Sequence, residues 1–275
     1  MTAATLATRD LTPRIATEVR ADKESLLSGV HADAIRGLLE ERGVLVFPQI
    51  WFTDDEQVAF TETLGNLATE SRGEKVYNVT LDRSVNKGAD YLKGSLYWHI
   101  DGTMNEVPIL ASLLSSKVLP QNGGGDTEFC NTYAAYEDLS DEDKQKLGSL
   151  RVMHSAWNTL LYYDPEPDIR TLRQMMAIGE RELPLIWMHR SGRKSLILGC
   201  TASHIINMDL KSSTETLVRL RDWATRPELV YRHRWSVGDL VMWDNTGTMH
   251  RVRPYDPDSG RMLTRTKLAG EEPFA

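Results

Sequence analysis

The segment YWHIDGT, residues 97–103, places a histidine and an aspartate two positions apart. On an extended backbone such side chains leave the same face, so His99 and Asp101 can reach one point in space. An imidazole and a carboxylate together suit divalent metals, and two histidines with one carboxylate leave three coordination positions open, as in non-haem Fe(II) oxygenases. The pair alone also fits a polar strand end, so a metal site requires a second histidine.

His250 is the second histidine that the sequence favours. It follows DLVMWDN (239–245), a segment typical of a strand, which runs into a loop that contains glycine. The other histidines are His31, His154, His189, His204 and His233. None of these five has surroundings that suggest chemistry. We expect His31, which opens a predicted helix, and His233, which lies between two arginines, to be exposed.

Two arginines follow His250 at short spacing. In RMLTRTKLAG (261–270) the strand period of two places Arg261, Arg265 and Lys267 on one face. A guanidinium there can bind a carboxylate through two parallel hydrogen bonds, a geometry that lysine cannot reproduce. A surface ion-pair network is the alternative for arginines on such a strand.

A glycine-rich segment, PQNGGGDTEFCN (120–131), is the last part of the candidate site. Its glycines permit a tight turn or the close approach of another group to the backbone. Thr127 adds a hydroxyl that can donate to a carboxylate oxygen. A plain hairpin loop is the alternative.

The remaining sequence predicts the elements that position these residues. We expect a helix over 30–42, a buried strand over 44–47 and a helix from the capping box of Thr53 and Glu56 to about residue 65. A second capping pattern, Ser212 with Glu215, predicts a helix that ends near residue 225. Strands are frequent throughout and dense at the end, which favours a mainly β fold with flanking helices, a sandwich or jelly roll, in a single domain over 1–275.

Composition excludes several classes of partner. The net charge is -7 and no basic block stands out, so nucleic acid is not expected as a partner. No apolar run approaches the ~20 residues of a membrane helix. The two cysteines, Cys130 and Cys200, form no disulfide framework, and the first residues show no secretory signal, so we expect a cytoplasmic protein.

Taken together, these segments resemble the taurine dioxygenase/2,4-dichlorophenoxyacetate dioxygenase (TauD/TfdA) family of Fe(II)- and 2-oxoglutarate-dependent enzymes. The matching segments are GVLVFPQ (43–49), WHID (98–101), GGDTEF (124–129), DLVMWDNTGTMHR (239–251) and GRMLTRTKLAGEEPF (260–274). The resemblance implies a double-stranded β-helix core, a relative of the jelly roll. It also implies Fe(II) as cofactor, and 2-oxoglutarate and O2 as co-substrates that yield succinate and CO2.

The resemblance also implies roles for individual residues. The implied iron ligands are His99, Asp101 and His250. Arg261 and Thr127 match the residues that hold the distal carboxylate of 2-oxoglutarate, and Arg265 matches an arginine near the substrate anion. Members of the family commonly form homodimers or homotetramers.

The sequence gives less information about the substrate than about the metal site. The taurine enzyme holds its sulfonate with a histidine in an early loop, and residues 69–80 contain none, which disfavours taurine. Tyr97 and Gly102 border the metal pair and are predicted to bind substrate. Residues 154–170 are predicted to form a lid whose apolar side chains, Trp157, Leu160, Leu161 and Tyr162, favour a larger apolar substrate; an ordinary surface loop is the alternative.

We therefore expect hydroxylation of a C–H bond in a small, anionic and partly apolar organic molecule. If the hydroxylated carbon carries a heteroatom, the product would collapse and cleave an ether, a sulfonate or a sulfate ester. Two alternatives are a non-catalytic jelly-roll protein that binds or senses a ligand through the metal, and a zinc hydrolase. The complete residue set argues against the first, and the absence of an evident glutamate base argues against the second.

Overall fold

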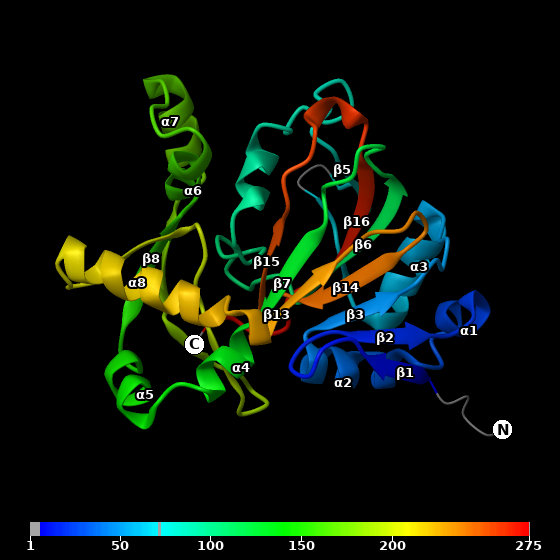
Figure 1. Ribbon diagram of the computed structural model, residues 1–275, viewed down its shortest axis with the longest axis horizontal. Coiled ribbons are helices and arrows are strands. Elements are labelled where there is room, and N and C mark those ends of the chain that lie inside the picture. Colours follow the sequence, from blue (N-terminus) through cyan, green and yellow to red (C-terminus); the bar gives the residue numbers. More distant parts are fainter. Residues whose placement is uncertain (1–5, 71–72, 275) are drawn as a thin grey trace.

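The computed structural model describes residues 6–70 and 73–274, and most of its elements are strands arranged in sheets with helices around them (Figure 1). The strands of the largest sheet, in spatial order, are β1 (Ala7–Asp10), β2 (Thr17–Arg20), β3 (Val44–Phe47), β14 (Leu240–Asp244), β6 (Ala111–Val118), β16 (Met262–Leu268) and β4 (Leu67–Ala68), and β5 (Tyr77–Val79) also pairs with β16. Among these described strands the neighbours are antiparallel, except for β2 and β3, which are parallel. The predicted mainly β class with flanking helices is confirmed.

A second, three-stranded sheet faces the large one. Its order is β13 (Val230–His233), β7 (Thr127–Asn131) and β15 (Thr248–Val252). Phe129 of β7 packs on Trp243 of β14 with 5.5 Å between ring centroids, inside a core cluster that also takes in Val46, Leu114 and Leu263. Because the two sheets bury apolar side chains against each other, the ends of β7, β15 and β16 are held in fixed relative positions.

Helices α2 (Ala32–Arg42) and α3 (Asp54–Leu64) cover the other face of the large sheet, preceded by the short α1 (Lys23–Leu27). The predicted capping box is confirmed: Thr53 Oγ1 accepts from the Glu56 backbone N–H at 3.2 Å, and Glu56 Oε2 accepts from the Thr53 backbone N–H at 2.8 Å. Helix α2 ends at Gly43, whose φ of 71° suits glycine.

The residues between β7 and β13 build the part that Figure 1 shows beside the facing sheets. Its strands are β8 (Arg151–Ser155), β9 (Glu180–Pro184) and β12 (Ala202–Ile205) in one sheet, and β10 (Ile186–Met188) with β11 (Lys194–Leu196) in a hairpin. Its helices are α4 (Thr132–Glu137), α5 (Asp141–Leu147), α6 (Ala156–Tyr163), α7 (Ile169–Met176) and α8 (Leu210–Ala224). The described residues also form three 3₁₀ helices: η1 (Tyr91–Leu96), η2 (Pro227–Leu229) and η3 (Pro257–Ser259). No helix in the described ranges combines the length and the apolar character needed to cross a membrane.

Three local predictions differ from the structure. The predicted Ser212 cap is wrong, because Asp209 stands at the N-cap of α8 and accepts from the Ser212 backbone N–H at 3.0 Å. His31 and His233, predicted to be exposed, are both buried. His233 Nε2 lies 3.1 Å from Asp239 Oδ2, a partner that the neighbouring arginines in the sequence do not reveal.

The burial of His154 on β8 leads us to expect a contribution to the pH dependence of stability. This side chain is wholly buried, Nδ1 lies 2.8 Å from Thr201 Oγ1, and Nε2 has no hydrogen-bond partner among the described residues. Burial lowers its pKa from 6.5 to about 3. Between these values the unfolded chain binds a proton that the folded chain does not, so the free energy of unfolding falls as the pH falls.

We expect this histidine to cost the protein about 2 kcal/mol of stability between pH 6.5 and about pH 5, at roughly 1.36 kcal/mol per pH unit. As the pH falls over this range, the free energy of unfolding of the wild type, minus that of His154→Gln, should decrease by that amount. Urea denaturation measures both values. His204→Gln, at an exposed position on β12, is the matched control and should leave the pH dependence unchanged. A difference that stays constant with pH would contradict the assignment.

Candidate functional site

The three candidate metal ligands lie close together because the backbone of His99 pairs with the backbone of His250. His99 N donates to His250 O at 3.0 Å and His250 N donates to His99 O at 2.9 Å, which places the imidazoles side by side with 4.1 Å between centroids. Asp101 Oδ1 lies 3.7 Å from His99 Nε2, and Asp101 Oδ2 lies 3.9 Å from His250 Nε2. One ligand atom from each residue lies within 4.8 Å of the other two, a spacing that one metal ion can bridge.

Neighbouring groups affect the orientation and the charge of these side chains. His99 Nδ1 lies 2.9 Å from the Tyr97 carbonyl, which can only accept, so Nδ1 is the donor and Nε2 is the ring nitrogen left to face a metal. Burial lowers the pKa of His250, which keeps its imidazole neutral. Burial alone would raise the pKa of Asp101, but the nearby Arg265 guanidinium lowers it to well below its usual range. Two imidazoles and one carboxylate are a donor set suited to a divalent first-row metal.

A cavity of about 470 Å³ opens at these ligands. Its wall includes apolar side chains such as Ile100, Ile109, Leu114 and Trp243, together with Thr127, Arg261, Arg265 and Lys267. A cavity of this size, mostly apolar with a few polar groups, suits small organic molecules.

Arg261 reaches the cavity as a cation without an acidic partner among the described residues. It is 3% exposed, Nη2 donates to the Gly125 carbonyl at 2.8 Å, and its Nε has no hydrogen-bond partner. Burial lowers its pKa, as expected of a cation short of compensating charge. Gly125 has a φ of +74°, and a Cβ there would lie 2.5 Å from Arg261 Nε, so at this glycine the missing side chain makes room for the arginine.

Thr127 lies at the start of β7 on the same cavity wall. Its Oγ1 accepts from Trp235 Nε1 at 3.0 Å. Since the indole can only donate, the hydroxyl proton of Thr127 remains free to donate to a bound carboxylate.

Arg265 is bound to two carboxylates. Its Nη1 lies 3.4 Å from Asp101 Oδ2, and its Nη2 lies 3.2 Å from Glu70 Oε1. Lys267, two residues further on the same face of β16, contacts Glu70 Oε1 at 2.9 Å. The sequence placed both cations on this face, but it gave no role to Lys267 and no sign of Glu70, which lies just beyond β4 and far from the motifs.

Gly102 and Tyr97, which border the metal pair in the sequence and were predicted to contact substrate, line different cavities. Gly102 lines the cavity, with a φ of +87°, and a Cβ there would meet Ile109 N at 2.8 Å, so any side chain would strain the backbone. Tyr97 lies elsewhere: it lines a separate cavity of about 270 Å³, and its hydroxyl donates to the Tyr162 carbonyl at 2.7 Å.

The predicted lid corresponds to α6 and the start of α7. Ala156 and Thr159 of α6 line the main cavity. The apolar side chains expected to wall it, Trp157, Leu160, Leu161 and Tyr162, are not among the lining residues. The apolar character of the wall comes instead from residues near the metal ligands, such as Ile100, and from side chains of β5, η1, β6 and β14.

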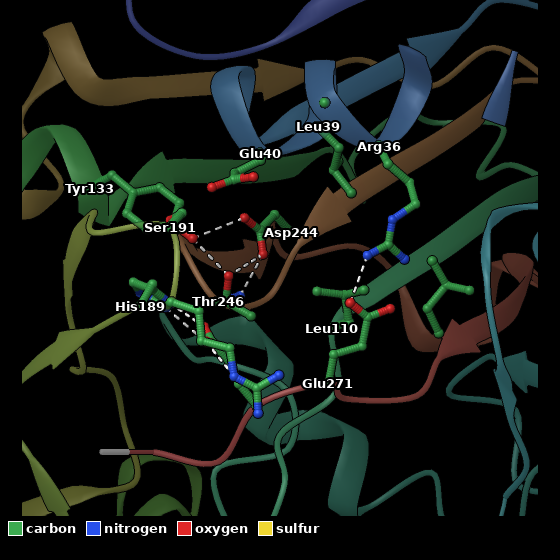
Figure 2. A pocket seen from close by; sticks show the side chains of 14 residues that line it. Arg36, Leu39, Glu40, Leu110, Tyr133, His189, Ser191, Asp244, Thr246 and Glu271 are labelled. Carbon is green, nitrogen blue, oxygen red and sulfur yellow. Dashed lines mark hydrogen bonds and ion pairs between the residues drawn. The ribbon is translucent and has the colours of Figure 1, made fainter. Parts of the chain in front are cut away.

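Figure 2 shows a different cavity, of about 270 Å³, beside helix α2. Its polar groups bind one another: Arg36 Nη2 lies 2.7 Å from Glu271 Oε2, and Asp244 Oδ1 accepts from the Thr246 backbone N–H at 2.7 Å. Burial raises the pKa of Asp244 to about 6. None of the predicted site residues lines this cavity, so it does not compete with the histidine site.

The geometry agrees with comparisons to known proteins. A model of the family "Taurine catabolism dioxygenase TauD, TfdA family" matches residues 7–267. An alpha-ketoglutarate-dependent 2,4-dichlorophenoxyacetate dioxygenase from Burkholderia sp. (strain RASC) is 35% identical, over 90% of this chain and 88% of that protein. An alpha-ketoglutarate-dependent sulfate ester dioxygenase from Pseudomonas putida is 31% identical, over 94% and 88%.

A solved structure supports the same relationship. The crystal structure of AAD-2 in complex with Mn(II) and N-oxalylglycine superposes with a TM-score of 0.84 at 32% identity, over 99% of this chain and 100% of that one. The chain belongs to the TauD/TfdA family and is a 2-oxoglutarate-dependent non-haem iron dioxygenase.

Proposed function

We propose that His99, Asp101 and His250 bind Fe(II), and that the cavity beside them accepts 2-oxoglutarate and a small anionic, partly apolar substrate. The convergence of two imidazoles and one carboxylate on the wall of the cavity carries this proposal. Arg261 and Thr127 would bind the distal carboxylate of 2-oxoglutarate, because both offer free donors on the same wall. Arg265 would attract the substrate anion, and Gly102 would border the substrate.

When bound, the iron allows O2 and 2-oxoglutarate to oxidise a substrate C–H bond to C–OH, with succinate and CO2 as the other products. The chain's own residues position the reactants. Arg261 and Gly125 fix where the carboxylate end of 2-oxoglutarate can lie, and so direct its keto acid end toward the histidines. Apolar side chains such as Ile100 and Trp243 limit the water in the site.

The substrate class follows from charge and shape. A carboxylate or sulfate would bind toward Arg265, and the apolar wall would take an aryl or alkyl group. Relatives are named for 2,4-dichlorophenoxyacetate and for sulfate esters, which both carry an anionic group near a carbon bonded to oxygen. Hydroxylation of this carbon gives a hemiacetal from the ether and an α-hydroxy sulfate from the sulfate ester. Each then breaks its C–O bond, leaving a carbonyl compound and releasing the alcohol or phenol, or sulfate, so we propose cleavage of an ether or sulfate ester. Tyr97 remains a predicted substrate residue that would act from outside the cavity.

The finer architectural predictions belong to the same proposal. The facing sheets support a double-stranded β-helix, or jelly-roll, core within one domain over 1–275, with α6 as part of a lid over 154–170. The free, buried thiols of Cys130 and Cys200 support a cytoplasmic location. A homodimer or homotetramer remains a prediction. Membership of a family of dioxygenases disfavours a non-catalytic binding protein or a zinc hydrolase.

One experiment tests the proposal. Purified apo-protein receives Fe(II), 2-oxoglutarate and O2, and succinate is measured with phenoxyacetate, a medium-chain alkyl sulfate and taurine. We expect succinate without substrate, and several-fold more with phenoxyacetate or the sulfate ester than with taurine. Without oxygen, Fe(II) and 2-oxoglutarate should give a charge-transfer absorbance band. Absence of both succinate and the band would refute the proposed use of the site, and equal stimulation by taurine would refute the substrate class.

A further inference from the structure

The carboxylate of Glu70 forms ion pairs with two of the cations that line the proposed substrate cavity, Arg265 and Lys267. Glu70 Oε1 lies 3.2 Å from Arg265 Nη2 and 2.9 Å from Lys267 Nζ, so one oxygen bridges both side chains. All three side chains are at most 20% exposed, and all three line the main cavity. Because solvent screens them little, the balance of charge here affects binding more strongly than at the surface.

The ionic groups of the cavity can be counted. The described lining residues that carry a full charge are Glu70, Asp101, Arg261, Arg265 and Lys267. Three cations against two carboxylates leave one positive charge. Fe(II) and the 2-oxoglutarate dianion cancel each other, so the loaded site would keep this single positive charge for its substrate.

We propose that Glu70, through its bridge to Arg265 and Lys267, sets the charge of the substrate that this site accepts, and selects monoanions over dianions. This inference rests on the proposed function, since it assumes that the substrate anion binds toward Arg265. A monoanion neutralises the site, whereas a dianion leaves an uncompensated negative charge in a poorly screened cavity, which is costly.

Glu70 could instead act only as a support for the backbone beyond β4. Its backbone N–H donates to the Glu74 carbonyl at 2.8 Å, and these main-chain contacts do not require a charged side chain. The two roles predict different results. A support affects all ligands alike, whereas a charge selector changes the ratio between ligands that differ only in charge.

Two probes of nearly equal shape separate these roles. Phenoxymethanesulfonate is a monoanion, and phenoxymethylphosphonate is close to a dianion at about pH 8.5. Both are titrated calorimetrically onto protein loaded with Mn(II) and N-oxalylglycine, so that binding is measured without turnover. The readout is the ratio of the phosphonate Kd to the sulfonate Kd.

The variants change the site charge in both directions. Glu70→Gln adds one positive charge and should lower the ratio at least about tenfold, and Lys267→Met removes one and should raise it by a similar factor. The double variant Glu70→Gln/Lys267→Met restores the original charge, so its ratio should return to within about threefold of the wild type. Glu62→Gln and Lys75→Met, from an exposed ion pair of 2.7 Å, are matched controls and should leave the ratio unchanged.

The outcomes separate this inference from the function on which it rests. A wild type that binds N-oxalylglycine but neither probe would refute the anionic substrate class, and the inference with it. A wild type that binds both probes, with the same ratio in Glu70→Gln or without its return in the double variant, would refute the role of Glu70 alone. Thermal melting of each variant identifies any loss of folding, and Lys267→Met tests the charge dependence even if Glu70→Gln is unstable.

Discussion

Asp101→Ala should abolish substrate oxidation, with a fall in kcat/KM of at least about a thousandfold, or ~4 kcal/mol of transition-state stabilisation. The substitution removes the only carboxylate of the ligand set and leaves two imidazoles, too few ligands to hold a divalent ion firmly. It also leaves Arg265 with Glu70 as its remaining acidic partner. Succinate release and bound iron per protein chain are the measurements.

The control for this prediction comes from a distant ion pair. Asp143 on α5 contacts Arg219 on α8 at 3.1 Å, away from the cavity. Asp143→Ala removes a paired carboxylate as well, and should retain iron and activity. If Asp101→Ala kept both its iron and its activity while remaining folded, Asp101 would not be a metal ligand.

Arg261→Met should weaken the binding of 2-oxoglutarate about a hundredfold, with a smaller effect on kcat at saturating co-substrate. The loss corresponds to ~3 kcal/mol, the order expected when charge-assisted hydrogen bonds to a carboxylate are removed. Arg261→Lys should recover only part of it, because an ammonium cannot form the two parallel bonds. The KM for 2-oxoglutarate and the Kd for N-oxalylglycine on the Mn(II) protein are the two measurements.

Arg219→Met removes the other side chain of the distant pair and serves as the control for this variant. It should leave both constants unchanged. Equal values for the wild type and Arg261→Met would show that the distal carboxylate binds elsewhere, for example at Arg265 and Lys267. That result would also remove the cations on which the proposed substrate binding depends.

The sequence predicted the parts of the site that local periodicity or a compact motif encodes. His99 and Asp101 share a face because they lie two positions apart, and the alternation around Arg265 placed Arg261, Arg265 and Lys267 on one face, where they line the same cavity. Helix α3 followed from its capping box for the same reason: all the necessary atoms lie within one turn.

Contacts between distant segments could not be predicted in this way. Glu70 reaches Arg265 only because β4 pairs with the end of β16, a contact across almost two hundred positions. Tyr97 was predicted to bind substrate because it borders the metal pair in the sequence, but its hydroxyl donates to the Tyr162 carbonyl and its side chain lines another cavity. His233 is likewise buried with Asp239 as its partner, and the local sequence does not show that the turn between them brings the two side chains together.

The backbone pairing between His99 and His250 has a consequence for the newly made chain. Each residue both donates to and accepts from the main chain of the other, across a long stretch of intervening sequence. A ribosome-bound chain therefore cannot assemble the three ligands until β15 has emerged and docked beside β7. Intermediates that still lack this strand present at most an isolated histidine and aspartate, so the nascent protein should acquire iron late, after the surrounding sheets can enclose it.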